Sequence, residues 1–199
     1  MNKHFRVSGS VFSKLEELGV RASAILRRAG LPQGFIDQPS VLLKTEELFA
    51  LWRAIGEVSA NPAIGLQLGT ETKTERFHPI GLAALSSENF GSAIEQMARY
   101  KQLTCPEEIL QEKDDAEWSI QFRWLLADKV EPPVLNDCCF AWVLSIARHG
   151  TGTGGKGSRD TGRLNACSSS LSSFPISICR ALKCLILPKG RNTGFGIYL

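Results

Sequence analysis

One segment of the chain, residues 117–125, alternates between polar and apolar side chains and constrains the fold most directly. Its apolar face carries Trp118, Ile120, Phe122 and Trp124, and its polar face carries Glu117, Ser119, Gln121 and Arg123. A period of two predicts a β-strand. Residues 114–116 join it to a second predicted strand over Ile109–Lys113. Most other apolar residues before Gly150 recur at helical spacing, so an α+β domain is predicted.

The apolar spacing before the two strands predicts a helical N-terminal part. Two short helices are expected over Val11–Ala29, where Gly19 interrupts the pattern. A longer helix should begin at Thr45, because the two acidic residues that follow suit the first turn of a helix. A short helix capped by Asn61, with a proline in its first turn, should follow.

Further helices are predicted on both sides of the strands. A short one is expected over Ile80–Leu85, and a longer one over Asn89–Thr104. The longer helix should turn five apolar side chains inward: Phe90, Ile94, Met97, Ala98 and Leu103. After the strands, Pro132-Pro133 opens a helix that runs to about Arg148 with a wide apolar surface. The predicted order is a helical N-terminal part, a helix, a short antiparallel β element and a covering helix.

The character of the sequence changes at Gly150. Residues 151–199 contain 8 of the 18 glycines, 7 of the 23 lysines and arginines, and a single acidic residue, Asp160. Helical periodicity is lost over residues 152–173, and only Ile176–Leu187 is apolar enough to pack. We therefore expect a folded domain over residues 1–150 and an irregular basic tail over residues 151–199.

Composition narrows the class of protein. With 43% hydrophobic and 22% charged residues, the chain is typical of soluble globular proteins. No apolar run reaches the roughly 18 residues that a membrane helix needs, and no apolar stretch follows the first basic residues, so a cytoplasmic protein without a membrane span is expected. None of the six cysteines forms a C-x-x-C pair and the three histidines are scattered, so no metal site is predicted.

Three stretches of sequence share a family pattern in order and spacing. The first is residues 25–32 (ILRRAGLP), the second is residues 51–54 (LWRA) with residues 61–69 (NPAIGLQLG), and the third is residues 80–87 (IGLAALSS) with Ala93-Ile94 and Ala98-Arg99-Tyr100. Through these stretches, roughly residues 10–150 of the chain resemble the N-terminal, arabinose-binding-like domain of AraC-type transcription regulators.

The resemblance implies a regulatory module of a cytoplasmic transcription factor, which binds a small-molecule effector or forms a homodimer. It implies no cofactor and no enzymatic activity. Regulators of this type continue with more strands and a C-terminal domain of two helix-turn-helix units. After Thr153 the sequence aligns with none of these, so we expect DNA contact only through a C-terminal domain that is absent here. We interpret the tail as the result of a truncation or frameshift near Gly154.

Two patterns admit a different interpretation that involves nucleic acid or nucleotides. Residues 11–30 also fit a helix-turn-helix with three arginines on its second helix, but so few basic residues beside two glutamates favour an ordinary helical hairpin. The run Gly150–Ser158 has the spacing of a phosphate loop. It follows a helix rather than a strand, and Gly157 stands where the hydroxyl residue belongs, which favours a linker.

A thiol-dependent enzyme is the other alternative. Its nucleophile would be Cys105, Cys138 or Cys139, and His78 would be its base. Cys105 follows a predicted helix C-terminus, where the helix dipole raises a thiol pKa. The other two cysteines lie on an apolar helix face. Structural roles are therefore favoured for all three.

The candidate effector-binding residues lie on the β element and the helix before it. Core packing explains the aromatic stripe of residues 118–124 better than a ligand platform does. We place an effector pocket between the predicted sheet and its two flanking helices. There Tyr100 would supply a hydroxyl, Arg123 a cation and Trp118 an aromatic surface to a small polar or anionic ligand.

Overall fold

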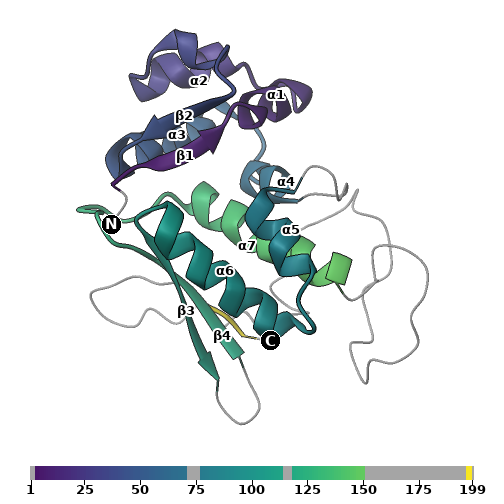
Figure 1. Ribbon diagram of the computed structural model, residues 1–199. Coiled ribbons are helices and arrows are strands. Elements are labelled where there is room, and N and C mark those ends of the chain that lie inside the picture. Colours follow the sequence, from purple (N-terminus) through teal and green to yellow (C-terminus); the bar gives the residue numbers. More distant parts are fainter. Residues whose placement is uncertain (1–2, 71–76, 114–117, 151–195, 199) are drawn as a thin grey trace.

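The computed structural model describes residues 3–70, 77–113, 118–150 and 196–198. In chain order its elements are β1 (Phe5–Ser8), α1 (Ser10–Glu17), α2 (Ala22–Ala29), the 3-10 turn η1 (Gln33–Phe35), β2 (Ser40–Leu43), α3 (Thr45–Val58), α4 (Ile64–Gly69), α5 (Pro79–Leu85), α6 (Phe90–Thr104), β3 (Glu107–Lys113), β4 (Trp118–Trp124), α7 (Pro133–Gly150) and β5 (Gly196–Tyr198). Figure 1 shows β1, β2 and α1–α3 gathered at one end of the molecule and the second sheet with α6 at the other.

The first half of the chain packs helices against a two-stranded sheet. β1 and β2 pair antiparallel, with Phe5 opposite Leu43. A tight turn at Gly19, whose φ of +77° favours glycine, separates α1 from α2. The Glu16 carboxylate accepts a hydrogen bond from the Ala22 amide at 2.7 Å, which satisfies a donor that the start of α2 would leave free.

α2 ends at a glycine in the left-handed conformation. Gly30 has φ +69°, and the Leu31 amide donates to the Leu26 carbonyl at 2.9 Å, as in a Schellman motif. α3 begins at Thr45, where the Glu47 carboxylate accepts from the Lys44 amide at 2.8 Å. These bonds satisfy backbone groups at the end of α2 and at the start of α3.

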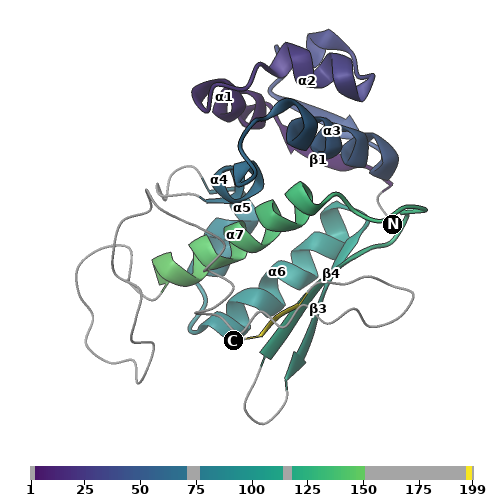
Figure 2. The ribbon, with the colours of Figure 1, turned by 180° about the vertical axis from the view of Figure 1, so that it is seen from behind.

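The second half builds a three-stranded antiparallel sheet in the order β3-β4-β5. Glu107 lies opposite Trp124 at one end of the β3–β4 pair, and Ile120 pairs with Ile197 of β5. α6 lies across one face of this sheet, and α7 runs beside α4 and α5, as both views show (Figures 1 and 2). α6 starts at Asn89, whose side chain accepts a hydrogen bond from the Ser92 amide at 2.9 Å.

Two clusters of buried side chains form the core, and α7 belongs to both. The first cluster lies among β1, β2 and α1–α4 and includes Leu135 of α7. The second lies among α5, α6, β3, β4 and α7, and includes Val143 and Ile146. Cys139 packs against both clusters. α7 therefore ties the helical first half to the sheet.

α4 and α7 approach each other closely because glycines line the contact. A Cβ built at Gly65 would lie 2.4 Å from the Val134 carbonyl oxygen, and one at Gly69 would lie 2.1 Å from the Cys138 carbonyl oxygen. No side chain fits at such distances. The two glycines, four residues apart, therefore allow the backbones of the two helices to touch.

The structure confirms the predicted α+β class and the order of helices and strands from α1 to α7. Two expectations need correction. The strands β1 and β2 were not expected. Leu103 is 70% exposed rather than inward, because it lies on the outer side of the last turn of α6. Within the predicted basic tail, residues 196–198 pair with β4 as β5. The rest of that tail, with the glycine-rich run after Gly150, lies outside the described residues.

No helix in the described part of the chain combines the length and hydrophobicity that a membrane span requires.

Candidate functional site

An open pocket of about 350 Å³ lies on the outward face of α3. Five residues of its lining come from that helix: Glu46, Ala50, Arg53, Ala54 and Glu57. Their spacing of three or four residues places them on one stripe. The opposite stripe of α3 is buried in the first core cluster. The amphipathic pattern that fixes α3 in the fold therefore leaves the other four side chains at least partly exposed, whereas Ala54, at 1% exposure, belongs to the first core cluster.

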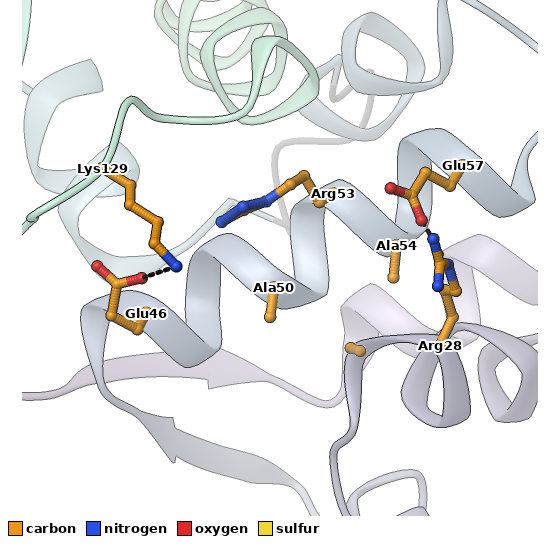
Figure 3. Close-up of a pocket in the computed structure, with 8 residues that line it drawn as sticks. Arg28, Glu46, Ala50, Arg53, Ala54, Glu57 and Lys129 are labelled. Carbon is orange, nitrogen blue, oxygen red and sulfur yellow. Dashed lines mark hydrogen bonds and ion pairs between the residues drawn. The ribbon is translucent and has the colours of Figure 1, made fainter.

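Two other segments complete the pocket. Arg28 and Ala29 come from the last turn of α2, just before the left-handed Gly30, and Lys129 comes from the segment between β4 and α7. Figure 3 shows how the lining side chains of these three segments lie around α3.

The carboxylates of the pocket each have a cationic partner. Arg28 Nε lies 2.5 Å from Glu57 Oε2, and Lys129 Nζ lies 3.9 Å from Glu46 Oε2. These pairs are solvent-exposed, and exposed ion pairs contribute only about 0–1 kcal/mol each to stability. They hold the walls of the pocket only weakly.

Arg53 is the third cation, and in the described part of the chain it has no carboxylate partner. Its Nε donates to the Phe49 carbonyl at 3.5 Å, a long hydrogen bond one turn back along α3. Figure 3 shows its guanidinium extended along the helix toward Lys129, between the two ion pairs. A guanidinium carries five N–H donors, so its terminal nitrogens remain available to a ligand. With three cationic and two acidic side chains, the pocket has a formal charge of +1.

A second polar group lies inside the protein, between α6, β3 and α7. Lys101 Nζ donates to Glu107 Oε2 at 2.6 Å, and their side chains are 19% and 1% exposed. Lys101 also lies 5.8 Å from the ring centroid of Trp142. The other carboxylate oxygen, Glu107 Oε1, is buried and has no hydrogen-bond partner among the described residues. The pair satisfies Lys101 while leaving half of the Glu107 carboxylate without a partner.

The charges and the burial of this group shift the pKa values around it. Burial by itself would lower the pKa of Lys101, but the Glu107 carboxylate, together with the nearby thiols, outweighs it, so this pKa is raised. The pKa of His78 is lowered, first by burial and then by the charge of Lys101. Lys101 is therefore held in its charged form, whereas His78 is biased toward its neutral form.

The cysteines in the described part of the chain are unsuited to nucleophilic chemistry. Burial raises the pKa of the Cys138 thiol to about 12. Burial and then the charge of Glu107 raise the pKa of Cys139, and burial raises that of Cys105. The thiolate is the reactive form, so these thiols are inert at neutral pH. They fill space between helices and β3, as the sequence favoured. At Cys105, burial rather than the helix dipole is the main cause of the raised pKa.

The candidate effector residues on the β element are not brought together. Tyr100 is 40% exposed on α6. Arg123 pairs with Glu108 on the exposed face of the sheet, away from α6. The backbone of Trp118 lies in β4, but its side chain is outside what the structure describes. Between the sheet and the helices, the expected place of the pocket is filled by apolar side chains of the second cluster, and Phe122 contacts Phe140 with ring centroids 5.1 Å apart.

Sequence reasoning missed the residues of the α3 pocket, although a signal was present. The outward stripe of α3 combines two alanines with an arginine and two glutamates, which differs from a uniformly charged solvated face. The contributions of Arg28 and Lys129 carry no comparable signal, since they meet α3 only through the tertiary fold. The sequence likewise could not predict the burial of the Lys101–Glu107 pair, because lysine and glutamate are normally exposed.

The helix-turn-helix alternative has little support from the geometry. α2, its proposed reading helix, buries Ala22, Ile25 and Leu26 against the first core cluster. Of its arginines, Arg28 is paired with Glu57. Few cations are left to meet phosphate groups. Nor do three or more His, Cys, Asp or Glu side chains gather as metal ligands within the described ranges.

Comparison with models of known protein families identifies the family of this chain. Residues 19–159 match the family described as the arabinose-binding domain of AraC transcription regulators, N-terminal. All of the residues that line the α3 pocket fall inside this match. A search of curated proteins finds no match. The match covers well over half of the chain, and the chain therefore belongs to the family of N-terminal arabinose-binding domains of AraC transcription regulators.

Proposed function

We propose that this domain senses a small-molecule effector in the α3 pocket and thereby regulates transcription as part of an AraC-type regulator. The observation that carries the proposal is that the pocket combines three segments, α2, α3 and the approach to α7, within the region that the family match covers. The family is one of regulatory, effector-binding domains. A ligand held there would contact elements that belong to different parts of the chain.

The physical basis for sensing is that the charged side chains around the pocket are held only by weak ion pairs, whereas the helices α2 and α3 behind them are packed in the first core cluster. The two ion pairs are exposed and contribute little. A ligand that contacts Lys129 and α3 together would restrain the segment that leads into α7. Since α7 packs into both core clusters, that restraint would reach the whole domain.

A ligand panel with a thermal unfolding readout tests this proposal. Sugars, amino acids and small organic acids at millimolar concentration would be added singly to the full chain. A compound that binds only the folded state stabilises it by about 2.7 kcal/mol at a concentration of 100 Kd. We expect at least one compound to raise the unfolding midpoint, and to lose its effect when Ala50→Trp, at a partly exposed position of the same helix, fills the pocket. A panel without any shift would overturn effector sensing by this chain.

Homodimerisation is a second proposed role. Leu103 and Tyr100 lie one turn apart on α6 and are both exposed, and Leu82 is exposed on α5, which packs against α6. Such apolar exposure favours association. Sedimentation velocity should show a dimer that Leu103→Gln weakens and that Leu42→Gln, on the distant β2, leaves intact. A monomer at all accessible concentrations would refute it.

In this proposal the chain does not read DNA by itself. α2 is committed to the first core cluster, and the tail, with one acidic residue among its last 49, has the composition of an irregular segment rather than of two helix-turn-helix units. A gel-shift titration should find no retention of a DNA duplex at moderate salt. Sequence-specific retention would contradict this part of the proposal.

A further inference from the structure

We propose that the effector of the α3 pocket is a small carboxylate and that Arg53 is its principal ligand. This inference rests on the proposed function, and it adds the chemical class of the effector and the residue that recognises it. It is carried by the charge balance of the pocket, by the free end of Arg53 and by the apolar residues that line the pocket.

The charge balance favours an anion. Arg28 engages Glu57, and Lys129 lies 3.9 Å from Glu46, whose Oε1 is buried and has no hydrogen-bond partner among the described residues. Arg53 has no ion-pair partner in the described part of the chain, and the five charged side chains sum to +1. A monoanionic ligand would bring the pocket from a formal +1 to neutrality. A neutral ligand would leave the surplus charge in place, and a cation would add to it.

The shape of the guanidinium favours a carboxylate in particular. Arg53 uses only Nε, in a long contact to the Phe49 carbonyl. Its two terminal nitrogens can therefore form the paired, parallel hydrogen bonds that a planar carboxylate accepts. Figure 3 shows this end of Arg53 directed toward Lys129, so a second anionic or hydroxyl group of the ligand could be reached by the lysine ammonium.

The apolar lining of the pocket is consistent with a short aliphatic skeleton. The apolar residues that line the pocket are Ala29, Ala50 and the largely buried Ala54, and none of its lining residues is aromatic. Stacking on a ring therefore contributes nothing to recognition at this site. Specificity must come from the charged side chains, with the alanines leaving room for a few methylene groups within about 350 Å³.

The test uses succinate and citrate as carboxylate probes and L-arabinose as a neutral probe. Midpoints of thermal unfolding and titration calorimetry would be recorded for the full chain and for Arg53→Gln, Arg53→Lys and Arg99→Gln. Arg99 is an exposed arginine of α6 outside the pocket, so its variant is the matched control. Arg53 is itself exposed, and all of these variants should fold.

We expect succinate or citrate to bind the wild type and Arg99→Gln equally. Arg53→Gln should weaken binding about tenfold, and Arg53→Lys should give an intermediate loss because it keeps the charge but not the paired donors. Binding should also weaken severalfold when salt is raised from about 0.05 M to about 0.5 M, since the pocket is open to solvent.

Two results would overturn the inference while leaving effector sensing intact. One is carboxylate binding that Arg53→Gln does not change, which would place the ligand elsewhere. The other is that L-arabinose or another neutral compound of the panel stabilises the chain while succinate and citrate do not, which would exclude a carboxylate as the effector. If no compound of the wider panel stabilises the chain, the proposed function fails as well.

Discussion

The close contact between α4 and α7 makes Gly69 a sensitive position for substitution. In Gly69→Ala the new methyl group would lie 2.1 Å from the Cys138 carbonyl oxygen and 2.8 Å from the Ala141 Cβ. The nearest of these atoms is backbone, so the helices must separate by more than about 1 Å to reach ordinary contact, since carbon atoms pack at about 3.5–4.0 Å. Overpacking of this kind costs about 1–3 kcal/mol.

An opposing effect must be subtracted from this cost. Alanine is a better helix former than glycine by about 1 kcal/mol in a helix interior. Gly69 is the last residue of α4, so the gain at this position is smaller. The clash therefore dominates, and we expect Gly69→Ala to lower the free energy of unfolding by about 1–2 kcal/mol.

Urea denaturation followed by circular dichroism measures this change. Gly34→Ala is the matched control, because a Cβ at Gly34 meets nothing within 4 Å and its φ lies outside the range that favours glycine. It should change the free energy of unfolding by less than about 0.5 kcal/mol. If Gly69→Ala proved as stable as the wild type, the backbone contact between α4 and α7 would be wrong.

Two further predictions concern the interior. Glu107→Ala would leave Lys101 buried without its partner and should destabilise the fold by about 3–5 kcal/mol in urea denaturation, against less than about 0.5 kcal/mol for the exposed Glu112→Ala. Because the pKa of Lys101 is raised in the folded state, the stability that its charge contributes is fully present below about pH 10, the ordinary lysine value, and declines at higher pH. Glu107→Ala should lack this alkaline loss of stability. Identical alkaline profiles for the two proteins would refute the pairing. Iodoacetamide at neutral pH should modify Cys138 and Cys139 slowly in the native protein and quickly in urea, because burial raises the pKa of both thiols. Peptide mass spectrometry measures this labelling. Rapid labelling of the native protein would contradict the burial of the two thiols and their raised pKa values.

Local patterns predicted those parts of the fold that local physics determines. α6 follows from its apolar spacing and its Asn89 cap, and β4 from strict alternation. β1 alternates in the same way, with Phe5 and Val7 buried, but a run of four residues is too short to predict a strand, and β2 carries three consecutive apolar residues. The two strands gain their stability by pairing with each other. The predicted burial of Leu103 was wrong because Leu103 lies nine residues after Ile94, which at about 100° per residue places it on the opposite face of α6.

The candidate site was less predictable than the fold. The helix α3 was expected, and its outward stripe could have been examined for small and charged residues at helical spacing. No local pattern predicts that Arg28 of α2 and Lys129 of the segment before α7 lie beside this stripe, because only the tertiary fold brings them there. The structure does not bring Tyr100 and Arg123 together, because alternation along β4 places Arg123 on the face opposite the helices, while Tyr100 lies on α6.

The sharing of α7 between the two core clusters has a consequence for dissecting the molecule. A fragment that stops before residue 133 would lose core residues from both clusters: Leu135 from the first and Val143 from the second. The halves should therefore not survive as autonomous folding units, and hydrogen exchange in the central turns of α7 should require global rather than local opening.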